Sequence, residues 1–493
     1  MKNLSTENKP DKLYRLIDSL DKPEKGFVKK FAALHIGDEA NSLRLFDIYN
    51  HLKKYDKEKI EKLVQKEKFA GYLSKTKNYL YDIILKALRV YHQDKDDWKR
   101  IRVNLLDVDM LYKKGLYNDA FSLLQKIKKE ALSREWNTVL IDAVNIEGKM
   151  VKTFDTSSDQ YLEKMNALHE ETKQYKQMDD VRQFYNDAMR ELFTLICNIA
   201  KEDPSNLKKK ALNIISSEKF KEYENFEGTK INLFRNFAIY QYYYICEDKE
   251  NFRIEAQKHL HLLNSENTLQ AFSAKLMAGY YNNLASLSIN LSELNIYKKC
   301  AEGVQKIIAH MKTTDDDYVH GINSYYKLQC EYYFEIKDAK NGLEIISKIQ
   351  ALEVEADDAI NGNKATTYYY KSAFLFFEKK YEEAIKPLNA IELFAEQQWV
   401  IHHEQIMLKI LCHLSLNKIE NAVYLAKKHL HYIKQNDLRF EERKIFLSLL
   451  IKNSPNAKEL AKMFLKECEN KNISKDKSAE ICLMNLKEWA KLN

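Results

Sequence analysis

Apolar residues recur along this chain every three or four positions, which is the period of an amphipathic helix. In the clearest example the apolar stripe contains Leu73, Leu80, Ile83, Ile84, Ala87, Leu88 and Tyr91. The opposite stripe contains Lys75, Tyr79, Asp82, Lys86 and Arg89. This pattern predicts a helix over 72–92, preceded by helices over 43–54 and 57–68 and by two shorter ones over 13–20 and 24–35.

Proline and glycine are scarce, and the positions of the prolines also indicate helices. The 493 residues include 11 Gly and 5 Pro, whereas average usage is about 7% Gly and 5% Pro. Pro23, Pro204 and Pro455 each follow an Asp or Ser by one or two positions, which is typical of a helix start. Sheet-rich sandwiches, barrels and glycine-looped nucleotide folds use more of both residues, so we expect an all-α protein.

A five-residue pattern recurs in which a large apolar residue and two polar residues precede a small residue and another apolar residue. It reads YNDAF at 117–121, YEEAI at 381–385 and IENAV at 419–423. Each copy follows a predicted helix and a short polar turn, and each opens a second helix. This arrangement resembles the tetratricopeptide repeat. The resemblance implies a right-handed α-solenoid of helical hairpins.

The spacing of the small residues indicates units longer than the standard repeat. Ala301, Gly342, Ala384 and Ala422 are 41, 42 and 38 residues apart, whereas the family's usual period is 34. The resemblance covers 241–430, includes one isolated unit at 107–127, and does not reach residues 1–100. A non-repetitive helical bundle is the alternative interpretation.

These observations divide the chain into four expected segments. They are a basic N-terminal helical bundle over 1–100, helical hairpins over 101–230 with one TPR-like unit, a TPR-like repeat array over 231–474, and a C-terminal capping helix over 475–493. The last segment places Cys482, Leu486 and Trp489 on one face and charges on the other. A solenoid needs such a helix, because its last repeat otherwise exposes an apolar face.

The excess positive charge lies entirely in the first segment. The chain has a net charge of +7, and residues 1–100 hold 23 basic and 16 acidic residues. The candidate anion-binding residues are Lys75, Lys77, Lys86 and Arg89. If 57–68 and 72–92 form a helix-turn-helix, these side chains would meet nucleic-acid phosphates. A solvated basic face is the favoured interpretation, because this stripe offers few groups that read base edges.

Tyrosines cluster on the predicted first helices of the repeats, at 242–244, 325–326, 332–333 and 368–370. In the resembled family, first helices line a concave groove that holds an extended peptide, and tyrosine is a favoured binding residue in such surfaces. Because consecutive residues on a helix point in different directions, part of each cluster belongs to the core. By repeat phase, the groove candidates are Gln241, Tyr244, Lys327, Glu331, Tyr369 and Phe376.

Sequence motifs for catalysis and cofactor binding are absent. No glycine-rich phosphate loop, GxSxG elbow or HExxH motif occurs, and the paired histidines at 259/261 and 429/431 point to opposite sides of a helix. We therefore expect no enzymatic activity, no cofactor and no metal. The seven cysteines are scattered and no long apolar segment or secretory signal occurs, so we expect a cytoplasmic protein that does not enter membranes.

Two functions are compatible with these features of the sequence. The first is a non-enzymatic scaffold that binds a protein or peptide segment in the groove of its repeats. The alternative is a nucleic-acid-binding regulator that uses the basic N-terminal helices and senses a ligand with the repeats.

Overall fold

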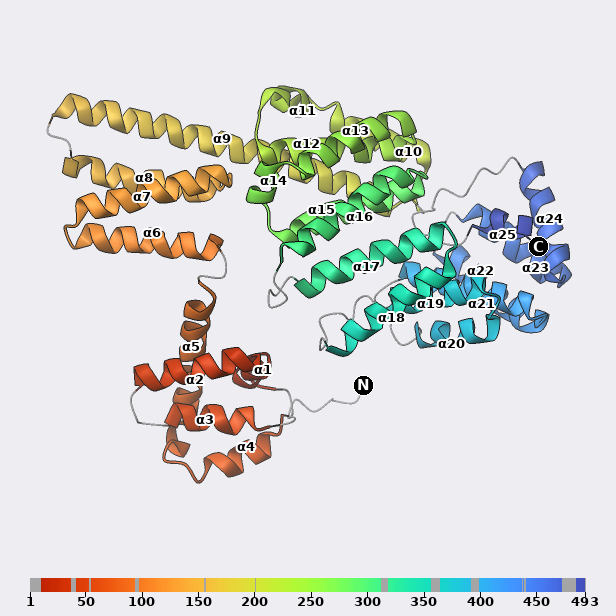
Figure 1. The fold of residues 1–493 in the computed structure, drawn as a ribbon, viewed down its shortest axis with the longest axis horizontal. Helices are drawn as coiled ribbons and strands as arrows, with labels where there is room; N and C mark the ends of the chain where they lie inside the picture. Colours follow the sequence, from red (N-terminus) through yellow and green to blue (C-terminus); the bar gives the residue numbers. More distant parts are fainter. Residues whose placement is uncertain are drawn as a thin grey trace. The chain divides into compact units, whose positions relative to one another are not determined.

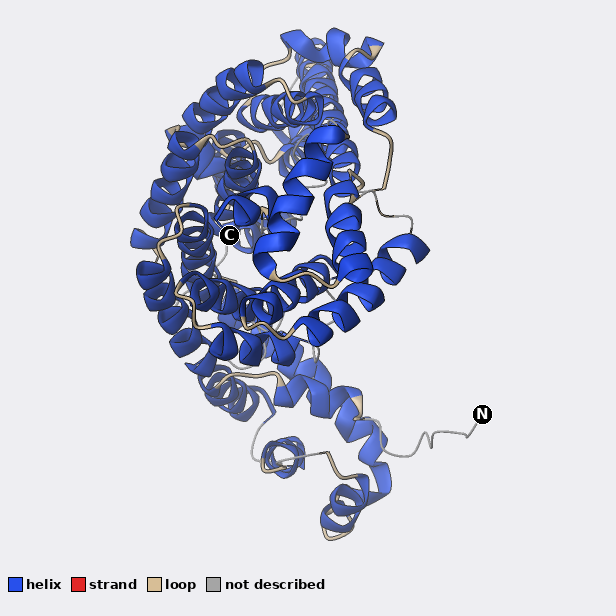
Figure 2. Cartoon of the chain, turned by 90° about the vertical axis from the view of Figure 1, so that its right-hand side faces the viewer, coloured by secondary structure: helices blue, strands red, loops and turns tan. Residues whose placement is uncertain are grey.

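The computed structural model describes most of the chain. The described residues are 10–36, 41–52, 55–93, 97–154, 157–199, 201–311, 318–355, 364–391, 399–436, 438, 440–471 and 485–492. Within these ranges the chain forms helices and connecting turns, and no strand occurs (Figure 2). The expectation of an all-α protein is therefore confirmed.

The chain divides into two compact units. Unit 1 comprises residues 1–130 and 139–172, and unit 2 comprises residues 131–138 and 173–493. The helix α9 (Ser158–Cys197) runs without interruption across the boundary between 172 and 173. This division is coarser than the four segments expected from the sequence.

Unit 1 begins with a bundle of five helices. They are α1 (Lys12–Asp18), α2 (Lys22–Ile36), α3 (Asn41–Asn50), α4 (Lys57–Val64) and α5 (Leu73–His92). The apolar stripe of α5 packs against the other helices, and Leu80, Ile84 and Ala87 are fully buried in the shared core. The predicted helix over 57–68 ends at Val64 instead, because the polar segment after it forms turns that lead into α5. Unit 1 continues with α6 (Asp97–Lys113), α7 (Tyr117–Ser133), α8 (Asn137–Phe154) and the first part of α9.

In unit 2, neighbouring helices pack in succession as hairpins (Figure 1). After α10 (Pro204–Ile215) and the short α11 (Glu218–Glu222), the hairpins are α12/α13 (Thr229–Cys246, Lys249–Leu263), α15/α16 (Ala274–Asn290, Leu294–Ala309), α17/α18 (Tyr318–Glu335, Ala339–Glu355), α19/α20 (Lys364–Phe377, Tyr381–Ile391), α21/α22 (Trp399–Ser415, Ile419–Gln435) and α23/α24 (Glu441–Asn453, Ala457–Asn470). The short α14 (Glu266–Ala271) lies between the first two hairpins in the sequence. Such succession is compatible with a helical-repeat solenoid.

The C-terminal helix α25 (Leu486–Leu492) packs on α24. The side chains of Leu486 and Trp489 are buried in the core that α17–α24 share. Their burial agrees with the apolar face expected for a capping helix, whereas Cys482 lies outside the described residues.

The turns inside the hairpins share one backbone conformation. One or two positions after each first helix, a residue adopts a positive φ of 43–64°, and these residues are Glu247, Ser292, Lys337, Lys379, Asn417 and Ser454. In the first five turns the next residue donates its N–H to a carbonyl five residues earlier, at 2.8–3.0 Å. This is the Schellman helix end, for which glycine is the usual residue. Here polar residues fill the position, so glycine content does not reveal the repeats.

The second helices carry small residues where a neighbouring helix approaches closely. Ala384 and Ala422 are fully buried, and Gly342 is buried as well. A Cβ atom added at Gly342 would lie 2.3 Å from Cζ of Phe374, which belongs to the next hairpin. A Cβ added at Gly303 would lie 2.4 Å from the ring of Tyr281. Both glycines are therefore required by packing, because an aromatic ring occupies the space of their missing side chains.

We expect Lys379→Gly to stabilise the chain by about 0.5–1 kcal/mol. A side chain at a left-handed position costs about 1–2 kcal/mol, and glycine removes most of that strain at some cost in unfolded-state entropy. The measurement is the thermal midpoint by circular dichroism. Lys427→Gly, which changes an exposed lysine inside α22, should instead lower the midpoint. A decrease for Lys379→Gly would contradict the strain argument.

We expect Gly342→Ala to destabilise the chain by about 1–3 kcal/mol, because the new methyl group overlaps the buried Phe374 ring. Gly279→Ala is the matched control, since no atom lies within 4 Å of the added Cβ and alanine favours the helix. Urea unfolding of both variants and of Gly342→Ala/Phe374→Leu would measure the effect. The smaller leucine should restore part of the loss, and an unchanged Gly342→Ala would refute the close approach.

Candidate functional site

Four of the six groove candidates lie in the protein core. Gln241 and Tyr369 are fully buried, and Tyr244 and Phe376 are buried except for a small part of each side chain. These four side chains pack among helices and do not offer an accessible surface to a peptide. The assumed repeat phase explains why these candidates were expected in the groove but lie in the core. A shift of one residue moves a side chain by about 100° around the helix.

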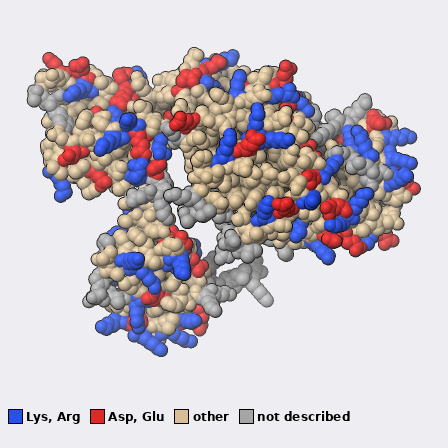
Figure 3. Space-filling view, viewed as in Figure 1, with Lys and Arg blue, Asp and Glu red and all other residues tan. Residues whose placement is uncertain are grey.

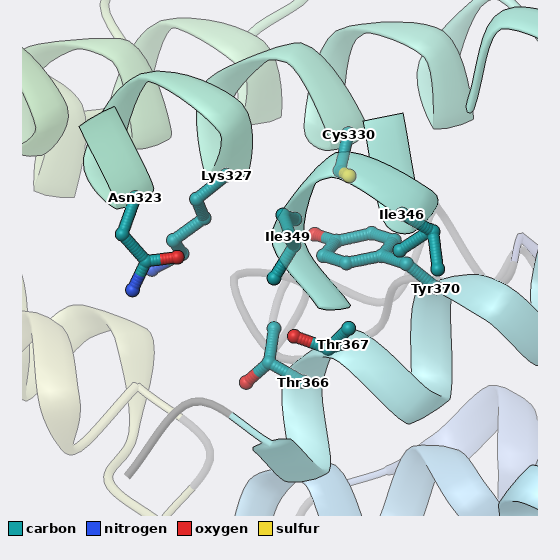
Figure 4. A pocket seen from close by; sticks show the side chains of 8 residues that line it. All are labelled: Asn323, Lys327, Cys330, Ile346, Ile349, Thr366, Thr367 and Tyr370. Carbon is teal, nitrogen blue, oxygen red and sulfur yellow. The ribbon is translucent and has the colours of Figure 1, made fainter. Parts of the chain in front are cut away.

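The fifth candidate, Lys327, lines a pocket between α17, α18 and α19 (Figure 4). The pocket is lined by Asn323, Lys327, Cys330, Ile346, Ile349, Thr366, Thr367 and Tyr370. It encloses about 280 Å³, part of which is open to solvent. Of the tyrosine cluster 368–370, it is Tyr370 that reaches the pocket, one residue after the candidate Tyr369.

The pocket has a polar side and an apolar side. Asn323 and Lys327 are one helical turn apart on α17, so their head groups lie next to each other and face the start of α19 (Figure 4). Thr366 and Thr367 lie in the first turn of α19. Ile346, Ile349 and the ring of Tyr370 form the apolar side. This arrangement suits a ligand group with a polar end and an apolar stem.

The sixth candidate, Glu331, lies one turn beyond Lys327 and does not line the pocket. Its Oε1 is 3.9 Å from Nζ of Lys327, and its Oε2 is 3.3 Å from the hydroxyl group of Tyr297. Only 13% of its side chain is exposed. This burial raises the pKa of Glu331, although Lys327 and the Tyr297 hydroxyl partly oppose the shift.

The pocket does not contain an activated nucleophile. Burial raises the pKa of the Cys330 thiol far above its usual value, and the nearby Glu331 carboxylate adds to the shift. Burial likewise raises the pKa of the Tyr370 hydroxyl. Both groups therefore stay protonated near neutral pH, whereas a reactive cysteine needs a lowered pKa. The pocket is equipped for binding through hydrogen bonds and one positive charge.

The anion-binding candidates of the N-terminal bundle fall into two groups. Lys77 donates a hydrogen bond of 2.8 Å to Oδ2 of Asp11, which also accepts one from the Tyr49 hydroxyl at 2.8 Å. Lys77 thus joins α5 to the start of α1 and is committed to a structural ion pair. Lys75, Lys86 and Arg89 are exposed on α5.

A second group of basic residues in the bundle was not singled out from the sequence. Lys and Arg side chains gather around α4 on the face shown in Figure 3. The exposed residues there are Lys57, Lys59, Lys62, Lys66 and Lys68. They alternate with Glu58, Glu61 and Glu67, so the basic character of this face is diluted by carboxylates.

The described part of the chain provides no metal site. No group of three or more His, Cys, Asp or Glu side chains in these residues could hold a metal ion. Within the same ranges, none of the helices combines the length and apolar character that crossing a bilayer needs. No family model matches the chain, and no curated protein is significantly similar to it.

Sequence reasoning missed Asn323, Thr366, Thr367 and Tyr370. They lie on two different helices, and no local pattern shows that α17 and α19 pack together at these residues. The sequence at the start of α19 offered one local indication of the pocket. Polar residues in the first turn of this helix stand next to a tyrosine cluster, so the helix N-terminus and an aromatic ring lie close together.

We expect Glu331→Gln to stabilise the chain at neutral pH. Because the pKa of Glu331 is higher in the folded chain than in the unfolded chain, the folded form binds more protons above about pH 4.5, so its stability falls as the pH rises. Glutamine keeps an oxygen that can accept a hydrogen bond from the Tyr297 hydroxyl group. Because it does not ionise, it also removes the fall in stability at higher pH. Between pH 4.5 and 8, the thermal midpoint of the unaltered chain should fall below that of Glu331→Gln. The difference between the two midpoints should then become constant. Equal midpoints for both proteins at every pH would contradict the burial argument.

Proposed function

We propose that this chain is a non-enzymatic helical-repeat scaffold that binds a protein or peptide segment. In this proposal, unit 2 is a right-handed solenoid of TPR-like hairpins, and the pocket between α17, α18 and α19 receives one side chain of the bound segment. The chain acts in the cytoplasm and uses no cofactor. The four core residues Gln241, Tyr244, Tyr369 and Phe376 support the fold and do not contact the ligand.

The pocket itself is the observation that carries the proposal. Asn323, Lys327, Thr366, Thr367 and Tyr370 come from α17 and α19, which are the first helices of two consecutive hairpins. First helices are the elements that the tetratricopeptide resemblance assigns to ligand binding. The pocket is small and partly open to solvent, so we assign it one side chain of a longer partner and not a whole cofactor.

The test is selection from a displayed random peptide library against the full chain. We expect enriched peptides to bind with micromolar dissociation constants and to slow hydrogen exchange in α17 and α19. Thr366→Phe, which fills the mouth of the pocket, should weaken binding at least about tenfold, equivalent to about 1.4 kcal/mol. Ser347→Phe, on the exposed side of α18, is the control and should bind as the unaltered chain does.

Two results would overturn this proposal. Failure to enrich any peptide would remove the scaffold function. Peptides that bind equally well to Thr366→Phe would move the site away from the pocket. The alternative function, nucleic-acid binding through the basic bundle, is supported by the exposed Lys75, Lys86 and Arg89. Nanomolar, salt-sensitive binding of short duplex DNA or single-stranded RNA would favour it.

A further inference from the structure

We propose that the face of α23 and α24 that α25 covers is a docking site for a basic amphipathic helix of a partner protein, with α25 as its built-in competitor. This α25-binding face consists of Glu442 and Phe446 of α23 and the side of α24 that contacts α25 (Figure 1). It lies on other helices than the pocket between α17, α18 and α19. The proposal therefore stands independently of peptide binding in that pocket.

The apolar side of α25 shows what the face accepts. Leu486, Trp489 and Ala490 are only 3–5% exposed, and their spacing of three and four residues places them on one side of the helix. The ring of Trp489 meets the ring of Phe446 edge to face, with the centroids 5.5 Å apart. Aromatic pairs prefer this arrangement. The face thus fits a large apolar residue followed three positions later by an aromatic one.

Glu442 adds a charge preference to the face. Its side chain is only 8% exposed, and its Oε1 lies 3.2 Å from Nζ of Lys487. A buried carboxylate is costly unless a cation meets it. Lys487 is also near α24, because it partly opposes the rise that burial causes in the pKa of the Cys468 thiol. A helix that replaces α25 therefore gains from a basic residue next to its first large apolar residue.

The helix α25 is short enough to be replaced. It has seven residues, whereas isolated helices shorter than about 12–15 residues are marginal in water. Its helical form therefore depends on its contacts with α23 and α24. In the sequence, residues 472–484 lie between it and the segment that contains α24. A partner helix competes with this tethered contact, and the tether sets the effective concentration that the partner must exceed.

A second copy of the chain is the other occupant to consider, through exchange of α25 between two molecules. Such an exchange replaces each contact by an identical one, and association itself costs free energy. A partner helix longer than α25 adds contacts that the seven residues of α25 do not make. We therefore assign the face to a partner and not to a second copy.

The test adds a fluorescein-labelled peptide of residues 485–493 to the full chain and follows fluorescence anisotropy. In the chain, Trp489→Ala weakens the hold of α25 and leaves the covered face unaltered. We expect this variant to bind the peptide at least about tenfold more tightly than the unaltered chain does, because a larger fraction of molecules has the face open. Lys491→Ala, which changes an exposed residue of α25, is the control and should bind as the unaltered chain does.

The charge preference is tested in the Trp489→Ala chain. Adding Glu442→Gln should weaken peptide binding at least about tenfold, whereas Glu441→Gln, at the exposed neighbouring position, should leave it unchanged. A peptide with Lys487→Met should bind the Glu442→Gln chain and its parent equally well. This double-mutant cycle assigns the loss to the one ion pair.

If Trp489→Ala does not fold, Lys487→Met in the chain replaces it, since this change removes only the charged contact and should also raise the affinity for the peptide. Equal peptide affinity of the unaltered chain and these variants, or no saturable binding by any of them, would overturn the proposal. Binding that Glu442→Gln does not weaken would overturn the preference for a basic helix. A dimer of the unaltered chain in light scattering that dissociates in Trp489→Ala would assign the face to a second copy and refute the partner.

Discussion

The hairpins of unit 2 depend on aromatic rings that pack directly against the backbone of a neighbouring helix. At Gly342 the Phe374 ring occupies the place of a side chain, and at Gly303 the Tyr281 ring does the same. Dense packing of this kind leaves no room for an added methyl group. The close approach brings α18 and α19 together, and these helices form two sides of the pocket.

The turns inside the hairpins contribute to the same geometry. A residue with positive φ ends each first helix and directs the chain back along it. After two of these turns an aspartate accepts a hydrogen bond from the backbone N–H of an asparagine three residues later. The pairs are Asp248 with Asn251 and Asp338 with Asn341, both at 3.1 Å. The end of one helix and the start of the next are thus stabilised within a few residues.

Much of the fold could be predicted from local patterns, because helices are local. The apolar stripe of α5 identified a buried helix face correctly, and the small residues Ala384 and Ala422 are fully buried as expected. The repeated turns were harder to recognise, since polar residues such as Lys379 occupy the position where glycine is expected. The Asp–Asn pairs repeat the same spacing in two hairpins and were an available indication of the turns.

The candidate site could be predicted only in part. Lys327 was selected by the same repeat phase that also selected four core residues, so the sequence did not single out its place beside the pocket. Asn323 and Thr366 meet through the packing of α17 against α19, which depends on ring and backbone contacts distant in the sequence. The buried pair of Glu404 and Arg443, from α21 and α23, escaped prediction for the same reason.

Two amide side chains differ in their access to solvent. Gln241 is fully buried in α12, and among the described residues neither atom of its amide has a partner. A ligand has no evident path to it, so the unpaired amide lowers stability. Asn323 is 8% exposed and lines the pocket, and its amide is not among the buried atoms of the described residues that lack a partner. The same chemical group therefore costs free energy in one helix and remains solvated in another, and access from solvent makes the difference.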